Sequence, residues 1–248
     1  IECSTMSMKY LGETFDFHGG GSDLIFPHHE NEIAQSEGCT GCHPFVKYWL
    51  HNGFITVNEE KMSKSLGNFF MVIDILEHYE PETLRFFILS THYRSPLDFS
   101  DERLAEAQRS LSRLKTAQEN LQALMALMNA GPTEESLKLR RKVLELRNEF
   151  MEAMRDDFNT ALAISHMFAL AKEINIYYQS IVSIGSKPDG KLVSILQSVF
   201  AEMCSIIGVL ESTQGAVEAE SCGLEESLME MLIAMRQEAR SNKDYAQA

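Results

Sequence analysis

Two lysines, three residues apart, lie in a short segment rich in serine and glycine, Lys61-Met62-Ser63-Lys64-Ser65-Leu66-Gly67-Asn68. Ammonium groups held this close can converge on a polyphosphate, where they stabilise the charge that builds on a departing pyrophosphate. A bare K-x-x-K segment is common in exposed basic loops. The full string from Lys61 to Ser65 is far more specific, because it stands after a predicted β-hairpin and before a predicted helix. The hairpin is expected from residues 45–50 and 54–57.

A second group of residues could bind a metal. His28 and Glu32 are four residues apart, so on a helix they share one face. His29 pairs at the same spacing with Ile33, so only the His28 register offers two ligands side by side. Imidazole and carboxylate both bind zinc, and Cys3, in a predicted helix over residues 1–11, is a candidate thiolate ligand. Taken alone, a His/Glu pair is more often a surface hydrogen bond.

A run of glycines follows a short predicted strand, Phe15-Asp16-Phe17-His18, and reads Gly19-Gly20-Gly21. Glycine permits tight turns and a close approach of the backbone to a ligand. A plain turn between a strand and a helix would have the same composition, so the run is a weak signal by itself.

These segments, taken together, resemble one family, the cysteinyl-tRNA synthetases. The lysine segment matches the KMSKS signature of class I aminoacyl-tRNA synthetases, whereas the combination of Cys3, His28 and Glu32 is not shared with other class I enzymes. The resemblance is nearly continuous over residues 1–100 and weakens afterwards. It is carried by residues 1–8, 18–24, 26–36, 48–53, 61–70 and 84–95, and it recurs most clearly at residues 156–160, Asp-Asp-Phe-Asn-Thr.

The resemblance implies roles for individual residues. The family binds one zinc ion per chain through two cysteines, a histidine and a glutamate. The matching metal ligands here are Cys3, His28 and Glu32, with the fourth expected upstream of Ile1, in the stretch that would also hold the HIGH motif. The resemblance further implies the following: Lys61 and Lys64 as catalytic residues, Lys64, Ser63, His18, Gly20 and Gly21 as ATP-binding residues, and Asp23 and His18 as substrate-binding residues.

The implied activity is that of a cysteine–tRNA ligase, with cysteine, tRNA-Cys and ATP with Mg²⁺ as partners. On this interpretation the chain is the C-terminal portion of the enzyme and is inactive alone. One alternative is the mycothiol-pathway cysteine ligase, whose acceptor is an amino sugar. Another is a non-catalytic zinc- or tRNA-binding module. A third is a haem carrier, because Cys39-Thr40-Gly41-Cys42-His43 has the C-x-x-C-H attachment pattern.

The first part of the chain mixes short apolar runs, glycines and loops, and the part that follows is almost wholly helical in pattern. This order predicts an α/β region followed by an all-α region. Residues 1–97 are expected to be part of a class I Rossmann-like catalytic domain, and residues 98–211 a helical bundle that binds tRNA. The first bundle helix should begin after Ser100, an N-cap, and present an apolar stripe with one break at Gln118. Three more helices are expected over residues 134–157, 159–183 and 191–210. Residues 212–248 are expected to be a linker and the start of a truncated anticodon-binding segment.

Bulk composition sets further limits. The net charge of −14 argues against nucleic-acid binding, although Lys138-Leu139-Arg140-Arg141-Lys142 is locally basic; the other interpretation of that run is a solvated helix face. Five cysteines, an odd number at irregular spacing, argue against a disulfide framework. The sequence shows no signal-peptide order and no apolar run of about 20 residues. We therefore expect a cytoplasmic protein without membrane contact, as a monomer.

Overall fold

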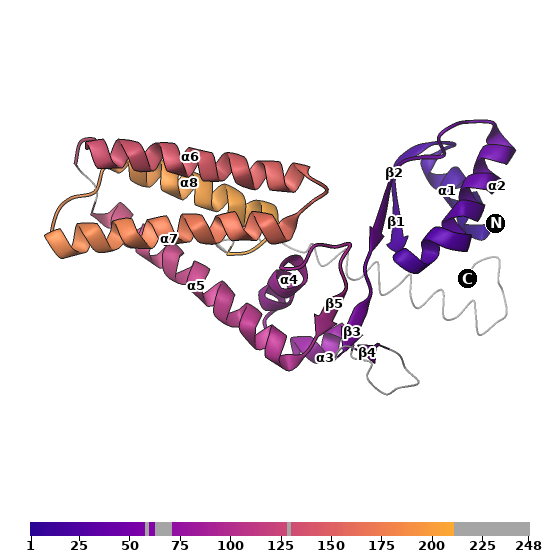
Figure 1. Ribbon diagram of the computed structural model, residues 1–248, viewed down its shortest axis with the longest axis horizontal. Helices are drawn as coiled ribbons and strands as arrows, with labels where there is room; N and C mark the ends of the chain where they lie inside the picture. Colours follow the sequence, from indigo (N-terminus) through magenta and orange to yellow (C-terminus); the bar gives the residue numbers. More distant parts are fainter. Residues whose placement is uncertain (58–59, 63–70, 128–129, 211–248) are drawn as a thin grey trace, which may run out of the picture. The chain divides into compact units, whose positions relative to one another are not determined.

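The first sheet of the chain is a parallel pair. The computed structural model pairs β1 (Phe15–Gly21) with β2 (Val46–Asn52), and α2 (Glu30–Thr40) lies between them in sequence (Figure 1). A 3₁₀ turn (Ser22–Leu24) and a π-helical turn (Ile25–His29) lead from β1 into α2. The preceding helix, α1 (Glu2–Leu11), packs on α2. This strand–helix–strand unit confirms the predicted α/β character of the first region.

A second sheet has the strand order β4-β3-β5. Its central strand β3 (Ile55–Val57) pairs antiparallel with β4 (Glu60–Lys61) and parallel with β5 (Leu97–Phe99). The predicted hairpin of residues 45–50 and 54–57 is therefore wrong. Gly53 lies so close to Ser95 that a Cβ there would be 2.4 Å from the Ser95 carbonyl carbon, and the chain passes into the second sheet. The hairpin before the lysine segment is β3–β4.

The structure describes residues 1–57, 60–62, 71–127 and 130–210. The part of the lysine segment from Ser63 to Asn68, including Lys64, lies outside these ranges. So do Met128 and the predicted linker and final segment at residues 211–248. Residues 1–210 form one compact unit. The predicted division of this unit near residue 97 stays a prediction.

Four helices form the bundle: α5 (Asp101–Ala126), α6 (Glu134–Arg155), α7 (Thr160–Ile184) and α8 (Gly190–Ile207). They agree with the predicted ranges to within three residues. The agreement follows from strong local signals. Ser100 accepts a hydrogen bond from the Arg103 amide at the start of α5, and Asn159 caps α7 through the Leu162 amide.

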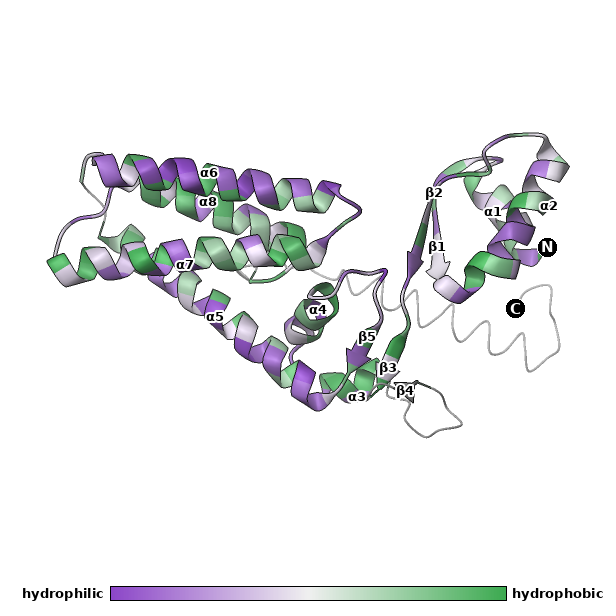
Figure 2. Ribbon diagram, in the orientation of Figure 1, coloured by the Kyte–Doolittle hydropathy of each residue, from purple (hydrophilic) through white to green (hydrophobic). Residues whose placement is uncertain are grey.

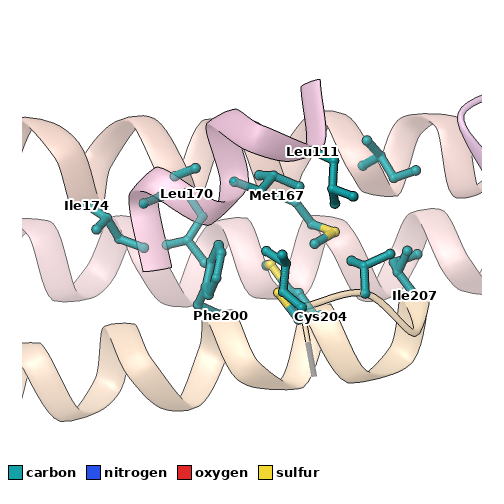
Figure 3. Close-up of a cluster of buried hydrophobic side chains, with 14 of the residues drawn as sticks. Leu111, Met167, Leu170, Ile174, Phe200, Cys204 and Ile207 are labelled. Carbon is teal, nitrogen blue, oxygen red and sulfur yellow. The ribbon is translucent and has the colours of Figure 1, made fainter. Parts of the chain in front are cut away.

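The core of the bundle is formed by aliphatic and aromatic side chains with Met167 and Cys204 among them (Figure 3). The apolar stripe of α5 differs in phase from the prediction: it continues at Ala117 and Leu124. Gln118 turns its amide to the Leu210 carbonyl at 3.1 Å, which satisfies the polar group that broke the pattern.

The bundle helices differ in hydropathy. Figure 2 shows α6 as largely hydrophilic and α8 as largely hydrophobic. Helix α8 has the length and the apolar composition to cross a membrane. Eight of its residues, most of them aliphatic, are buried in the bundle core, which accounts for most of its apolar composition.

Two short helices, α3 (Val72–Leu76) and α4 (Pro81–Leu89), come between β4 and β5 in sequence. Helix α4 packs on α5. Its buried Phe86 and Phe87 belong to the same hydrophobic cluster as the bundle core. The second sheet and the bundle therefore share apolar contacts.

Candidate metal centre and substrate pocket

Three side chains from two helices and a turn converge at one point. Cys3 is in α1, His28 is in the turn before α2, and Glu32 is in the first turn of α2. Their ligand atoms all lie within 4.8 Å of one another. His28 Nε2 lies 2.8 Å from Glu32 Oε1, as the four-residue spacing on one face requires. The structure thus brings together the three residues that the sequence singled out.

The Glu32 carboxylate is the most constrained group of this cluster. Its side chain is only 3% exposed, and its two oxygens face His28 and His18, the latter at 3.0 Å. Neither oxygen has a partner in hydrogen-bond geometry among the described residues. A buried carboxylate in this state is costly unless a positive charge lies beside it. The carboxylate therefore fits a cation site.

The donor set selects among cations. Sulfur, imidazole nitrogen and carboxylate oxygen are the ligand atoms that zinc takes in proteins. Calcium and magnesium instead take mostly oxygen ligands. The residues present therefore fit Zn²⁺ better than a hard cation.

A wall of four aromatic rings, those of His18, His29, Trp49 and His51, lies beside the cluster. His29 is buried, and its Nδ1 lies 2.8 Å from Nε2 of His51. Trp49 contacts His18, His29 and His51 through ring centroids 4.9–6.1 Å apart. Burial, together with the nearby His18, lowers the pKa of His29, so its ring is neutral near pH 7.

His29, Trp49 and His51 lie beside the cluster, although residue spacing alone did not single them out. In the sequence, His29 is four residues from Ile33, which cannot bind a metal. Trp49 and His51 enter only as part of the segment 48–53 that resembles the family. The pairing of β1 with β2 is the feature that identifies them. His18 lies opposite Trp49 and Gly20 opposite His51, so alternate residues of the two paired strands share one face.

The glycine run makes room for this wall. A Cβ on Gly20 would lie 2.8 Å from Leu24 Cδ1 and 3.1 Å from His29 Cε1. A Cβ on Gly21 would lie 2.4 Å from Oδ1 of Asp23, whose side chain is exposed. The Leu24 and Asp23 atoms are the ends of flexible side chains that can turn away, so the firmer constraint is the buried His29 ring beside Gly20.

The lysine segment begins at the edge of the second sheet. Lys61 is the last residue of β4 and is paired with Thr56 of β3. Ser63 and Lys64 lie outside the described residues.

The C-x-x-C-H segment faces carboxylates instead of a shared centre. The Cys42 thiol donates to Glu13 at 3.2 Å, and His43 Nδ1 lies 2.7 Å from Glu37. The hydrogen bond to Glu13 raises the pKa of Cys42. Within the described ranges, the only clustered set of three metal-binding side chains is that of Cys3, His28 and Glu32.

The basic run in α6 is largely neutralised. Lys138 pairs with Glu134 at 2.8 Å, and Lys142 with Glu173 at 2.6 Å. Arg140 pairs with the buried Asp189. These ion pairs favour a structural role for the run over a phosphate-binding patch.

Two protein-family models match separate parts of the chain. Residues 1–109 match the family model of the class I (C) tRNA synthetase catalytic domain, and residues 149–211 match the DALR domain. The fold is similar to that of a chain in the ternary complex of Agrobacterium radiobacter K84 agnB2 LeuRS-tRNA-LeuAMS. The TM-score is 0.56 at 18% identity, over 79% of this chain and 28% of that one.

Curated relatives match along the whole chain. It is 49% identical to the cysteine–tRNA ligase of Heliobacterium modesticaldum and 50% identical to that of Pelotomaculum thermopropionicum, in both cases over 100% of this chain and 52% of the relative. The Thermococcus onnurineus ligase is 45% identical over 100% of this chain and 51% of the relative. The chain thus spans about half the length of the curated relatives it matches. It belongs to the cysteine–tRNA ligase family of class I tRNA synthetases.

Proposed function

We propose that the protein to which this chain belongs activates cysteine with ATP and transfers it to tRNA-Cys. The observation that carries the proposal is the convergence of Cys3, His28 and the buried Glu32 on one point. A site that combines sulfur, nitrogen and oxygen donors suits a substrate that must be recognised by its thiol.

The metal site would supply the discrimination between cysteine and serine, which differ by one atom. Shape alone separates such near-isosteres by roughly 1–3 kcal/mol. Zinc, held by Cys3, His28 and Glu32 and a fourth ligand from elsewhere in the protein, would bind a substrate thiolate far better than a serine hydroxyl. The role of the three residues would be to hold that ion where the thiol of the substrate can reach it.

The remaining pocket residues would orient the amino acid. The exposed Asp23 carboxylate would bind the substrate ammonium, and His18 would line the pocket between Glu32 and Trp49. Neutral His29, fixed by its contact with His51, would keep this wall rigid without adding a second positive charge beside the ion. Positioning of this kind can supply a large part of the rate.

The reaction would proceed in two steps. A carboxylate oxygen of cysteine forms a bond to the α-phosphorus of ATP, and magnesium pyrophosphate leaves. Lys61, Lys64 and Ser63 would stabilise the leaving group, while Gly20 and Gly21 would let the backbone approach ATP. A terminal ribose hydroxyl of tRNA then attacks the cysteinyl carbonyl, and AMP leaves. The bundle would contact the tRNA body and residues 212–248 the anticodon, in a monomeric cytoplasmic enzyme.

The exchange of pyrophosphate into ATP in the presence of cysteine tests this proposal in the full-length protein. Lys64→Ala should lower the exchange rate by about 10²-fold or more, because it removes a charge that stabilises the transition state. Lys138→Ala, in the exposed face of α6, is the control and should leave exchange unchanged. Normal exchange by the Lys64 variant would remove the lysine segment from the mechanism.

A further inference from the structure

The turn between α6 and α7 has an unusual backbone. Asp157 and Phe158 have φ angles of 55° and 53°, a left-handed conformation that residues with a side chain seldom adopt. Two backbone hydrogen bonds, from Asp156 to Glu152 and from Asn159 to Ala153, hold the turn in place. Such a conformation persists where the surrounding structure requires it.

The Asp157 carboxylate reaches out of the bundle from this turn. It accepts a hydrogen bond from the Tyr93 hydroxyl at 2.7 Å and two from the guanidinium of Arg94. His92 Nε2 lies 3.9 Å from the same carboxylate. Three consecutive residues of the α4–β5 loop thus surround one side chain that is more than 60 positions away in sequence.

The α4–β5 loop is itself fixed to the two residues that link β2 to β3. The Gly53 amide donates to the Tyr93 carbonyl at 2.8 Å, and the Leu97 amide donates to the Phe54 carbonyl at 2.9 Å. Gly53 follows directly after β2, the strand that carries Trp49 and His51. These contacts do not involve Asp157, so the pocket keeps its frame without that side chain.

The α4–β5 loop therefore lies between two structures: the end of β2 on one side and the α6–α7 turn on the other. The bundle is also attached through apolar packing of α4 on α5. That packing would keep the bundle in place if the Asp157 contacts were lost, but it would leave the α6–α7 end free to shift.

We propose that Asp157 is a positioning residue for the tRNA-dependent step, which holds the α6–α7 turn against the loop of Tyr93 and Arg94 and so fixes the bundle relative to the cysteine pocket. The inference rests on the proposed function, in which the bundle contacts the tRNA body. A misplacement of about 1 Å can cost about 10²-fold in rate. The effect should therefore appear in the transfer of cysteine to tRNA and not in its activation.

The test uses the full-length enzyme and separates the two steps. Asp157→Asn retains a residue type that tolerates the left-handed turn but removes the charge. Cysteine-dependent pyrophosphate exchange, measured without tRNA, should stay within about twofold of wild type. The single-turnover transfer of cysteine from preformed adenylate to tRNA-Cys should fall by roughly tenfold or more.

Two further variants sharpen the result. Asp156→Asn removes the same charge one residue earlier, at an exposed position, and should leave both steps unchanged. Tyr93→Phe removes one of the hydrogen bonds to Asp157 and should slow transfer less than Asp157→Asn does. It also keeps the proposal testable if the Asp157 variant fails to fold.

The outcomes are distinct. Equal losses of exchange and transfer in either variant would show a merely structural role and overturn the proposal, as would unchanged transfer. An equal effect of Asp156→Asn would also overturn it. If wild-type enzyme neither exchanges pyrophosphate with cysteine nor charges tRNA, the proposed function fails instead, which the wild-type measurement alone reveals.

Discussion

A buried carboxylate beside two imidazole rings dominates the chemistry of the site at the scale of single residues. The Glu32 side chain is only 3% exposed, and its two oxygens lie 2.8 and 3.0 Å from nitrogens of His28 and His18 without hydrogen-bond geometry to any described residue. A buried carboxylate of this kind is costly unless an opposite charge lies beside it. The Cys3 sulfur and the His28 nitrogen next to Glu32 point to a metal ion as that charge, since these three donor types together suit zinc.

Cys3→Ser should lower the zinc content of the full-length protein and weaken its discrimination between cysteine and serine. The substitution replaces a soft thiolate ligand by a hydroxyl of nearly the same size. Loss of a hydrogen bond to a ligand already costs about 10–100-fold in metal affinity, so loss of the ligand should cost at least as much.

Metal analysis of the purified protein after dialysis measures this effect. Cys39→Ser is the matched control, because Cys39 is exposed and lies in a different part of the first region. Unchanged zinc in the Cys3 variant would exclude Cys3 as a ligand.

Residue spacing could predict only part of the site. His28 and Glu32 are neighbours in sequence, so helix geometry alone places them together. Trp49 and His51 are two residues apart on β2 and share a face, but His18 and His29 meet them only because β1 and β2 pair in parallel through a crossover that includes α2. Contacts of this kind depend on long-range register, which local patterns do not encode.

At the scale of secondary-structure elements, the start of α8 depends on one buried acidic residue, Asp189. Asp189 caps the helix by accepting from the amides of Lys191 and Leu192. It also accepts from Ser136 Oγ at 2.7 Å and pairs with Arg140. Burial opposes its ionisation, but the hydrogen bonds from Ser136 and Arg140 outweigh burial and lower the pKa of Asp189.

Asp189→Ala should therefore destabilise the bundle by about 3–5 kcal/mol, the usual cost of breaking a buried ion pair and leaving its partner behind. Urea unfolding followed by circular dichroism would measure the loss. Asp156→Ala is the control at an exposed position and should change stability by less than about 0.5 kcal/mol. A comparable loss in both variants would contradict a special role for the Asp189 network.

The elements themselves were unequally predictable. The bundle helices could be predicted because apolar spacing and capping residues such as Ser100 and Asn159 act within a few positions. The strands β4 and β5 could not, because they have two and three residues and their partners are set by chain connections. The phase of the α5 stripe was missed at Gln118, where one polar residue between apolar ones shifted the pattern.

At the scale of the whole molecule, the contacts between the bundle and the α4–β5 loop should respond to acid. Arg94, and after it Tyr93, lower the pKa of Asp157 to about 2, and His92 lies close by. A group with a depressed pKa in the folded state stabilises above its unfolded value, near 3.8, and loses that contribution as pH falls towards 2.

Thermal unfolding at pH 6, 4 and 3 should reveal this dependence. Wild type should have a higher Tm than Asp157→Asn at pH 6, and the gap should narrow as pH falls below about 4. Asp156→Asn should show no such gap at any of these values. A gap that is independent of pH would mean that the Asp157 charge does not contribute.

Cys204, deep among the bundle helices, offers a way to follow their motion. Its thiol is buried, and burial raises its pKa to about 12, so almost no thiolate exists at neutral pH. Alkylating reagents therefore meet a reactive sulfur there only when the helices separate. The rate at which this native cysteine becomes labelled would therefore report the rate at which the bundle opens, and no engineered probe is needed.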